Sequence, residues 1–190
     1  MNNQKLTEKK RRFLSGLAVL LAFPLVAAAP EFTSEPWPDQ APQARDAAVM
    51  KAVMMKAHND ARRSVRVGPL VWNDRLAAHA RSYAVELART NRFEHSEDTP
   101  GMAPEGENLW MGTRGAFGFA SMIGAWVDER RMYEDGTGSF HETGHYTQII
   151  WRGTSQVGCA LAKNASYEFL VCRYNPAGNI EGVDPLAWGS

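Results

Sequence analysis

The sequence predicts an α+β domain, because segments with helical periodicity come first and segments with the character of strands follow them. A chain of 190 residues is long enough for one domain with a substantial core. With 21 basic and 21 acidic residues it has no net charge, so we expect no strongly basic surface and no nucleic acid partner.

The first 29 residues have the three parts of a signal peptide. A basic cluster precedes an uncharged apolar run at 13–29, which ends in small residues before Pro30. We expect cleavage near Ala28 or Ala29, a secreted or periplasmic product and no membrane span after cleavage. A retained N-terminal anchor is the alternative. Without the five bases and one acid of residues 1–28, 16 bases and 20 acids remain, a net charge of −4.

Residues 30–44 carry four prolines among acidic and small residues, and they are predicted to form a linker. The domain is therefore expected to span 45–190. Its first helix is expected over 45–66, a stretch rich in Ala, Met and Arg that ends before Gly68 and Pro69.

A second helix is expected to begin after Asn73 or Asp74, either of which can cap it. One apolar stripe follows at helical spacing: Leu76, Ala80, Tyr83 and Leu87. A polar segment and a short apolar stretch, NLWMG, come next. A third helix is expected from about 116 to 133, with these residues on one face: Phe119, Met122, Ile123 and Trp126.

The pattern then changes to three short runs rich in Tyr, Thr, Ile, Val and Phe, which predict strands at 146–151, 156–162 and 168–174. The two cysteines, Cys159 and Cys172, allow one structural disulfide outside the cytoplasm. Placing them opposite each other gives an antiparallel hairpin with a self-consistent register. This register also sets an opposite-charge pair, Lys163 and Glu168, beside the turn.

The segment His141 to His145 reads HETGH and matches the zinc motif HExxH by letter. In that motif two histidines one helical turn apart bind the metal and the glutamate is the base. Neighbouring glycines and the strand-like residues that follow argue against a helix here. A metalloprotease is therefore disfavoured, and Glu168 is the one obvious downstream residue for a third ligand.

Four segments together resemble the CAP superfamily of cysteine-rich secretory, antigen 5 and pathogenesis-related proteins, also called SCP domains. GHYTQIIWRGT at 144–154 and FLVCRYNPAGNI at 169–180 resemble the two family signatures. HNDAR at 58–62 and GENLW at 106–110 resemble the shorter motifs, in the family's order. The resemblance implies an α-β-α sandwich with a three-stranded antiparallel sheet between helical layers. It also implies a disulfide between the last two strands.

The resemblance further implies a cleft lined by two histidines and two glutamates: His95, Glu107, Glu129 and His145. Two imidazoles with acid partners suit zinc or another divalent metal. Three residues of the HNDAR motif are expected to support the fold: His58, Asn59 and Arg62. The remaining histidines, His79 and His141, are expected to face solvent.

We therefore expect a secreted CAP module that binds a divalent metal, with zinc as the first choice. It is expected to act by binding, and no catalytic residue is assigned. A lipid, sterol or other small hydrophobic ligand is the other theme that the resemblance implies, although no aromatic-rich sterol loop is evident. A metal-dependent hydrolase or peptidase and a cell-wall or host-directed interaction protein are the alternatives. The short, cysteine-poor form with its basic, alanine-rich leader indicates a bacterial-type member.

Overall fold

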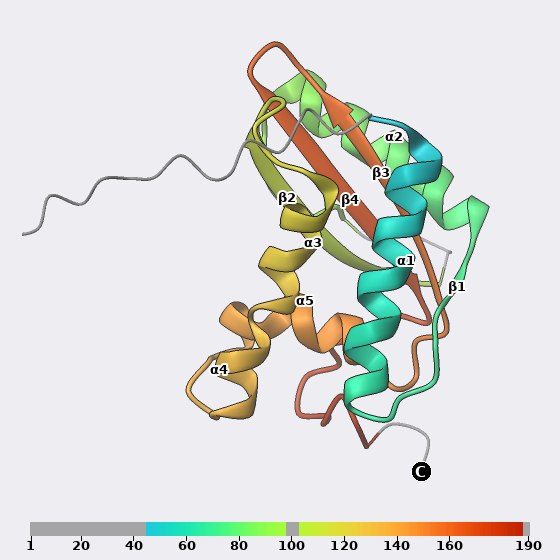
Figure 1. The fold of residues 1–190 in the computed structure, drawn as a ribbon, viewed down its shortest axis with the longest axis vertical. Helices are drawn as coiled ribbons and strands as arrows, with labels where there is room; N and C mark the ends of the chain where they lie inside the picture. The colour runs from blue at the N-terminus through green and yellow to red at the C-terminus, as the bar shows by residue number, and fades with distance from the viewer. Residues whose placement is uncertain (1–44, 98–102, 188–190) are drawn as a thin grey trace, which may run out of the picture. The chain divides into compact units, whose positions relative to one another are not determined.

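The computed structural model describes residues 45–97 and 103–187; the expected signal peptide and linker lie outside them. Figure 1 shows a central sheet between helices. Helix α2 (Asp74–Thr90) covers one face, and α1 (Ala47–Ser64), α3 (Phe119–Val127) and α5 (Phe140–Ile150) cover the other. The predicted α+β fold and α-β-α sandwich are confirmed. Within the described residues, no helix has the length and apolar character needed to cross a membrane.

Over the described part of the chain, the sheet has four strands in the order β1-β3-β4-β2. Three of them are antiparallel: β2 (Gly106–Thr113), β3 (Gln156–Lys163) and β4 (Tyr167–Asn175). The fourth, β1 (Val71–Trp72), has two residues and runs parallel to β3. The expected count of three is therefore corrected to four. The predicted strand at 146–151 is also wrong, since β2 takes the third antiparallel position.

Residues 146–150 instead belong to α5 (Phe140–Ile150), with Trp151 as its C-cap, and a capping box fixes the start of this helix. The backbone N–H and hydroxyl of Ser139 both donate to Glu142 Oε2, at 2.9 and 2.8 Å. Tyr146, Ile149 and Ile150 are fully buried at helical spacing, facing the core. Capping and burial of this stripe together outweigh the strand propensity of the individual residues.

The predicted hairpin is confirmed, with Cys159 opposite Cys172 and Lys163 opposite Glu168. The two cysteines form the expected disulfide, and their Cα atoms are 4.1 Å apart. The charge pair beside the turn is different from the prediction. Glu168 is buried and pairs with Arg45, whose Nη2 lies 2.8 Å from its Oε2, because the N-terminal end of α1 approaches this end of β4.

The third predicted helix is two helices, α3 (Phe119–Val127) and α4 (Arg130–Glu134). Its buried face is as predicted: Phe119, Met122, Ile123 and Trp126. The break falls at Asp128 and Glu129. The carboxylate of Glu129 bonds to α5 at this break, which is the main consequence of the division for the candidate site.

Helix α2 packs very closely on the sheet. Asn73 caps it by accepting hydrogen bonds from the backbone of Arg75 and Leu76. Its inner face consists of small and aliphatic residues: Leu76, Ala80, Ala84, Leu87 and Ala88. At Gly158 of β3 a Cβ atom would lie 2.6 Å from the Asn73 carbonyl oxygen and closer still to the backbone nitrogen of Ala77. Only glycine allows this approach.

Arg62 and His58 are buried polar residues of α1 that support the fold, as expected. The Arg62 guanidinium donates to the carbonyls of Gly68, Ile149, Trp151 and Thr154 at 2.6 to 2.9 Å. It therefore ties α1 to the end of α5. Asn59 likewise bonds to the backbone of Leu70: its Nδ2 donates to the Leu70 carbonyl at 3.2 Å, and its Oδ1 accepts from the Leu70 N–H at 2.8 Å.

His58 begins a chain of buried hydrogen bonds. Its Nδ1 lies 2.7 Å from the Met54 carbonyl oxygen, so Nδ1 carries the proton and donates. Its Nε2 then accepts from the hydroxyl of Tyr174 at 2.8 Å, and that oxygen accepts from Asn108 Nδ2 at 3.1 Å. Burial lowers the pKa of His58 to about 4, which keeps the ring neutral in the folded protein.

We expect Gly158→Ala to lower the free energy of unfolding by about 1–3 kcal/mol, since the added Cβ meets backbone atoms that cannot rotate away. Gly124→Ala is the matched control, because no heavy atom lies within 4 Å of its Cβ position inside α3. That change should be stabilising by about 0.5–1 kcal/mol. Urea denaturation of both variants measures the difference. Equal effects would contradict the close packing of α2.

We also expect the protein to lose stability between pH 6.5 and pH 4. The unfolded chain protonates His58 below pH 6.5, whereas the folded chain resists protonation down to about pH 4. The stabilisation from the neutral ring is complete above pH 6.5, and roughly 3 kcal/mol of it is lost on acidification. His58→Gln should flatten this part of the pH profile of unfolding, whatever its effect at neutral pH. An unchanged slope would contradict the assignment.

Candidate functional site

A cavity of about 310 Å³ lies where β2 begins, beside the N-terminal half of α5. Its wall includes three of the four residues predicted for the cleft, His95, Glu107 and His145. The fourth, Glu129, contacts His145 directly. The structure thus brings the four residues together in two histidine–glutamate pairs.

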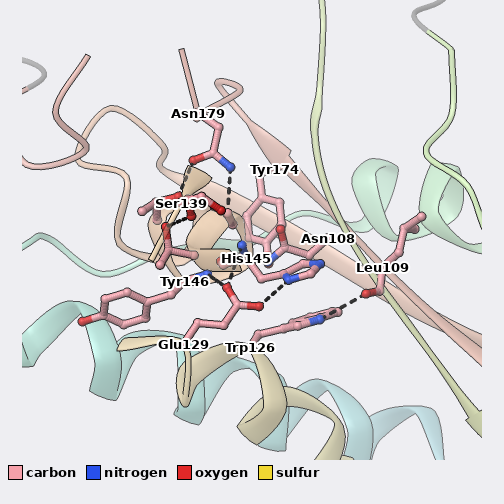
Figure 2. Close-up of polar contacts among 12 residues, drawn as sticks. Asn108, Leu109, Trp126, Glu129, Ser139, His145, Tyr146, Tyr174 and Asn179 are labelled. Atoms are coloured by element: carbon pink, nitrogen blue, oxygen red, sulfur yellow. Dashed lines mark hydrogen bonds and ion pairs between the residues drawn. The ribbon is translucent and has the colours of Figure 1, made fainter. Parts of the chain in front are cut away.

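The first pair joins α5 to the break between α3 and α4. Glu129 Oε1 lies 2.5 Å from His145 Nδ1, and Glu129 Oε2 accepts from the backbone N–H groups of His145 and Tyr146, both at 3.0 Å. Figure 2 shows the carboxylate between the ring and the helix backbone. The carboxylate is 14% exposed, and three donors satisfy it.

Surrounding residues fix the position of His145. The indole of Trp126 stacks on its ring, with centroids 5.7 Å apart and planes inclined by 15°. Trp126 is held by its Nε1, which donates to the Leu109 carbonyl at 3.2 Å (Figure 2). Asn108 Nδ2 donates to the carbonyl of His145 at 3.1 Å. The orientation of this imidazole is therefore set before any ligand binds.

The second pair joins the segment after α2 to β2. Glu107 Oε1 lies 2.7 Å from His95 Nδ1 and accepts from the backbone N–H of Ser96 at 3.0 Å. Arg173 of β4, the residue opposite Glu107 in the sheet, places Nη2 2.8 Å from Glu107 Oε2. The same nitrogen donates to Ser96 Oγ at 2.7 Å. His95 is 66% exposed, whereas Glu107 is 7% exposed.

The charges of this second pair shift both pKa values. Burial alone would raise the pKa of Glu107, but the hydrogen bond from His95, the charge of Arg173 and the bonds from Ser96 together lower it. The hydrogen bond to Glu107 raises the pKa of His95 above its ordinary value of 6.5, against the opposing effects of burial and Arg173. Glu107 is therefore ionised at neutral pH and favours protonation of His95.

Both pairs leave the same chemical group available. An ionised carboxylate only accepts, so each neutral imidazole must carry its proton on Nδ1. Nε2 then has a free lone pair. A histidine that gives its other N–H to a carboxylate is the arrangement in which imidazoles bind metals in proteins. In the described residues, however, no group of three or more His, Cys, Asp or Glu side chains is placed to hold one ion.

The expectation that HETGH would not be helical is wrong, because the motif lies in α5. Its glutamate is nevertheless engaged, since Glu142 forms the capping box with Ser139. Glu168, the residue considered for the third ligand, lies opposite Gly112 in the sheet, at the other end of β2 from Glu107. It is therefore remote from the cleft. The geometry therefore does not assemble the zinc site of a metalloprotease. His141 is exposed, as expected, on the wall of the cleft.

His79 does not simply face solvent. Its Nδ1 lies 2.8 Å from Glu105 Oε1, and its side chain is 36% exposed. This is a third histidine–glutamate pair, but His79 lines a neighbouring cavity and not the one that holds His145.

Three residues that the sequence did not single out complete the site: Asn108, Arg173 and Asn179. Asn179 accepts from Thr147 Oγ1 at 2.7 Å and donates to the Gly144 carbonyl at 2.8 Å, next to His145. Predicting GENLW as a strand paired with the last strand would have placed Glu107 opposite Arg173. That register would have identified their ion pair from the sequence. Asn179 has a φ of 57°, a value that asparagine tolerates, but no sequence pattern identified it.

We expect neutral His145 to be the Nδ1–H tautomer. Long-range ¹H–¹⁵N spectra at a pH above the titration of the ring distinguish the two ring nitrogens. Glu129→Ala should shift the population toward Nε2–H, since the acceptor for Nδ1 is removed, while Glu105→Ala, which removes the partner of His79, should leave His145 unchanged. A dominant Nε2–H form in the native protein would contradict the pairing.

Comparison with known proteins shows relatives across most of the domain. The model of the cysteine-rich secretory protein family, CAP, matches residues 55–174. The pathogenesis-related protein PRMS of Zea mays is 35% identical over 176 residues, which cover 89% of this chain and 96% of the maize protein. Pathogenesis-related protein 1A of Nicotiana tabacum is 37% identical over 135 residues, 69% of this chain and 77% of the tobacco protein.

Solved structures show the same fold. NaASP2, whose crystal structure was determined with Zn²⁺, has a TM-score of 0.57 at 23% identity, covering 72% of this chain and 84% of that protein. Venom allergen-like protein 4 of Schistosoma mansoni has a TM-score of 0.53 at 20% identity, with coverage of 68% and 88%. At these identities the likeness establishes the fold alone. The family model and the maize and tobacco relatives show that the chain belongs to the cysteine-rich secretory protein, or CAP, family.

Proposed function

We propose that this chain is an exported CAP domain that binds a divalent metal ion, best matched by zinc, through His95 and His145. One observation carries the proposal: two imidazoles line one cavity, and each has Nδ1 directed to its own carboxylate. This leaves two Nε2 atoms for a metal that accepts nitrogen ligands. The leader at 1–29 and the secretory character of the family support export and an extracellular location.

The donor set fits a zinc ion that keeps open coordination positions. Two imidazoles supply half of a tetrahedral set, and the described residues offer no third His, Cys, Asp or Glu close enough to join them. When bound, such an ion supplies a Lewis acid that attracts an anionic or carbonyl oxygen of a ligand. The chain itself orients the rings through Glu107, Glu129 and Trp126. It therefore acts by binding.

Other functions lack a specific observation in this cleft. Metal-dependent hydrolysis needs a base beside the metal, and Glu142 is held in the capping box. A lipid or sterol ligand needs an enclosed apolar cavity, whereas this one is small, open and lined by charged and amide side chains. A wall-directed or host-directed role would use the same binding chemistry on a larger ligand.

We expect calorimetric titration of the full protein with zinc to show binding. His95→Ala and His145→Ala should each weaken it at least tenfold, because each removes one of two ligands. Glu107→Gln should weaken it by about 10–100-fold by loosening a ligand. His79→Ala is the matched control, since this histidine has a glutamate partner but lies outside the cleft. His141→Ala should also have little effect. Circular dichroism verifies that each variant is folded.

Zinc affinity should fall as the pH is lowered, because protonation removes the lone pair of Nε2. The fall should begin above pH 6.5, since Glu107 raises the pKa of His95. Loss of binding in His141→Ala with retention in His95→Ala would instead indicate the HExxH site. Absence of zinc binding to the native protein would leave the four residues as a polar cluster that supports the cleft.

A further inference from the structure

The outer edge of β3 is only partly covered by another strand. β1 pairs with Gln156 and Val157, and among the described residues no strand lies beside the remainder of β3, from Gly158 to Lys163, on this side. Strand edges with unpaired backbone groups readily accept a further strand. This edge is therefore a candidate binding element.

The disulfide and β1 together determine which residues direct their backbone groups outward. In an antiparallel pair, residues in the non-hydrogen-bonded positions have Cα atoms about 4.5 Å apart, and their N–H and C=O groups point away from the partner strand. Cys159 and Cys172 are such a pair, at 4.1 Å. Val157, two residues earlier, confirms the direction, because its carbonyl accepts from Asn73 N–H on the β1 side at 2.9 Å.

Period-two alternation then extends this direction to Leu161 and Lys163. Neither these residues nor Cys159 forms a further backbone hydrogen bond with the described part of the chain. Cys159 is 2% exposed, so its N–H and C=O groups are almost removed from water. Buried backbone groups of this kind need a partner. The edge thus presents three alternate residues, Cys159, Leu161 and Lys163, whose backbone groups can pair with a strand.

The edge is recessed in a groove between two helices. The cavity over it has a volume of about 650 Å³ and is bounded by the start of α1 and by α2. Apolar side chains lie along it: Met50, Trp72, Phe119 and Leu161. Figure 1 shows α1 and α2 on opposite sides of β3, with β1 short of the far end of the strand. A single extended chain fits between the helices, whereas the sheet of a second copy would meet them.

The groove carries cations without ion-pair partners. Lys51, Arg81 and Lys163 line it, and none of the three forms a salt bridge with a described residue. Three carboxylates also line the groove: Glu168 pairs with Arg45, Asp46 caps α1, and Asp74 accepts from Trp72 Nε1 at 2.9 Å. With Arg45 included, four cations face these three acids, so a net charge of +1 favours an acidic occupant.

We propose that this groove binds an extended, acidic peptide segment of a partner protein, which adds to the sheet as a strand along Cys159–Lys163. Main-chain hydrogen bonds to the three outward residues supply the pairing, and the three cations supply the charge preference. A fatty acid could satisfy the cations and the apolar floor, but it has no backbone to pair with the edge. The groove shares no lining residue with the histidine cleft, so this inference does not depend on zinc binding.

The test uses a short acetylated and amidated peptide of alternating glutamate and valine, followed by amide hydrogen exchange of the ¹⁵N-labelled protein. Bound peptide should slow exchange at Cys159, Leu161 and Lys163 by at least about tenfold. Ala160 and Ala162 face β4 in the ladder and serve as internal controls whose exchange should not change. The same peptide with alternate amides N-methylated keeps its charge but cannot pair, and it should not bind.

Charge reversals in the protein test the second part. Arg81→Glu and Lys163→Glu should each weaken binding by roughly threefold to tenfold. Arg89→Glu is the control on the same helix, because Arg89 is exposed and does not line the groove. Equal binding of the N-methylated peptide, or unchanged exchange at saturation, would overturn the proposal. Protection of the edge on dimerisation, without peptide, would overturn the proposal and assign the edge to a second copy. If oleate displaced the peptide while the edge stayed protected, the proposal would be overturned in favour of a lipid ligand.

Discussion

The buried guanidinium of Arg62 is the interaction on which the rest of the structure depends. It is 2% exposed, and four carbonyl oxygens, without any carboxylate among the described residues, satisfy it. Two of them, from Ile149 and Trp151, belong to the C-terminal end of α5, where the helix dipole is negative. Burial lowers the pKa of Arg62 to about 10, so it stays charged at neutral pH. This charge fixes where α5 ends and how α1 meets it.

Fixing α5 also fixes the cleft, because His145 lies in the same helix. A continuous series of hydrogen bonds runs from His58 through Tyr174 and Asn108 to the backbone of His145. Because His58 Nδ1 donates to the Met54 carbonyl, the ring accepts from Tyr174, and the Tyr174 oxygen accepts from Asn108, so the direction of each of these hydrogen bonds is fixed. Glu129 then holds the ring from the other side. The geometry of one candidate ligand is thus a property of the core.

Those parts of the fold that depend on local rules could be predicted from the sequence. The hairpin register followed from Cys159 and Cys172, and the start of α2 followed from its cap. Helix α5 was missed because the capping box of Ser139 and Glu142 decides the outcome in residues whose individual propensities favour a strand. The cleft followed only from the family resemblance, since its paired residues are 12 and 16 positions apart on different elements and no periodicity relates them.

The two candidate ligands differ in how firmly the folded protein holds their side chains. His145 is 30% exposed and is held by a helix, a stacked indole and a carboxylate. His95 is 66% exposed and lies in a segment without regular structure between α2 and β2, where Glu107 is its main anchor. Binding one ion to both rings must therefore order the His95 side chain against an already fixed partner. If the cleft binds a metal as proposed, the conformational entropy lost at His95 limits the affinity, and Glu107 and Arg173, rather than α5, are the residues that would adjust it.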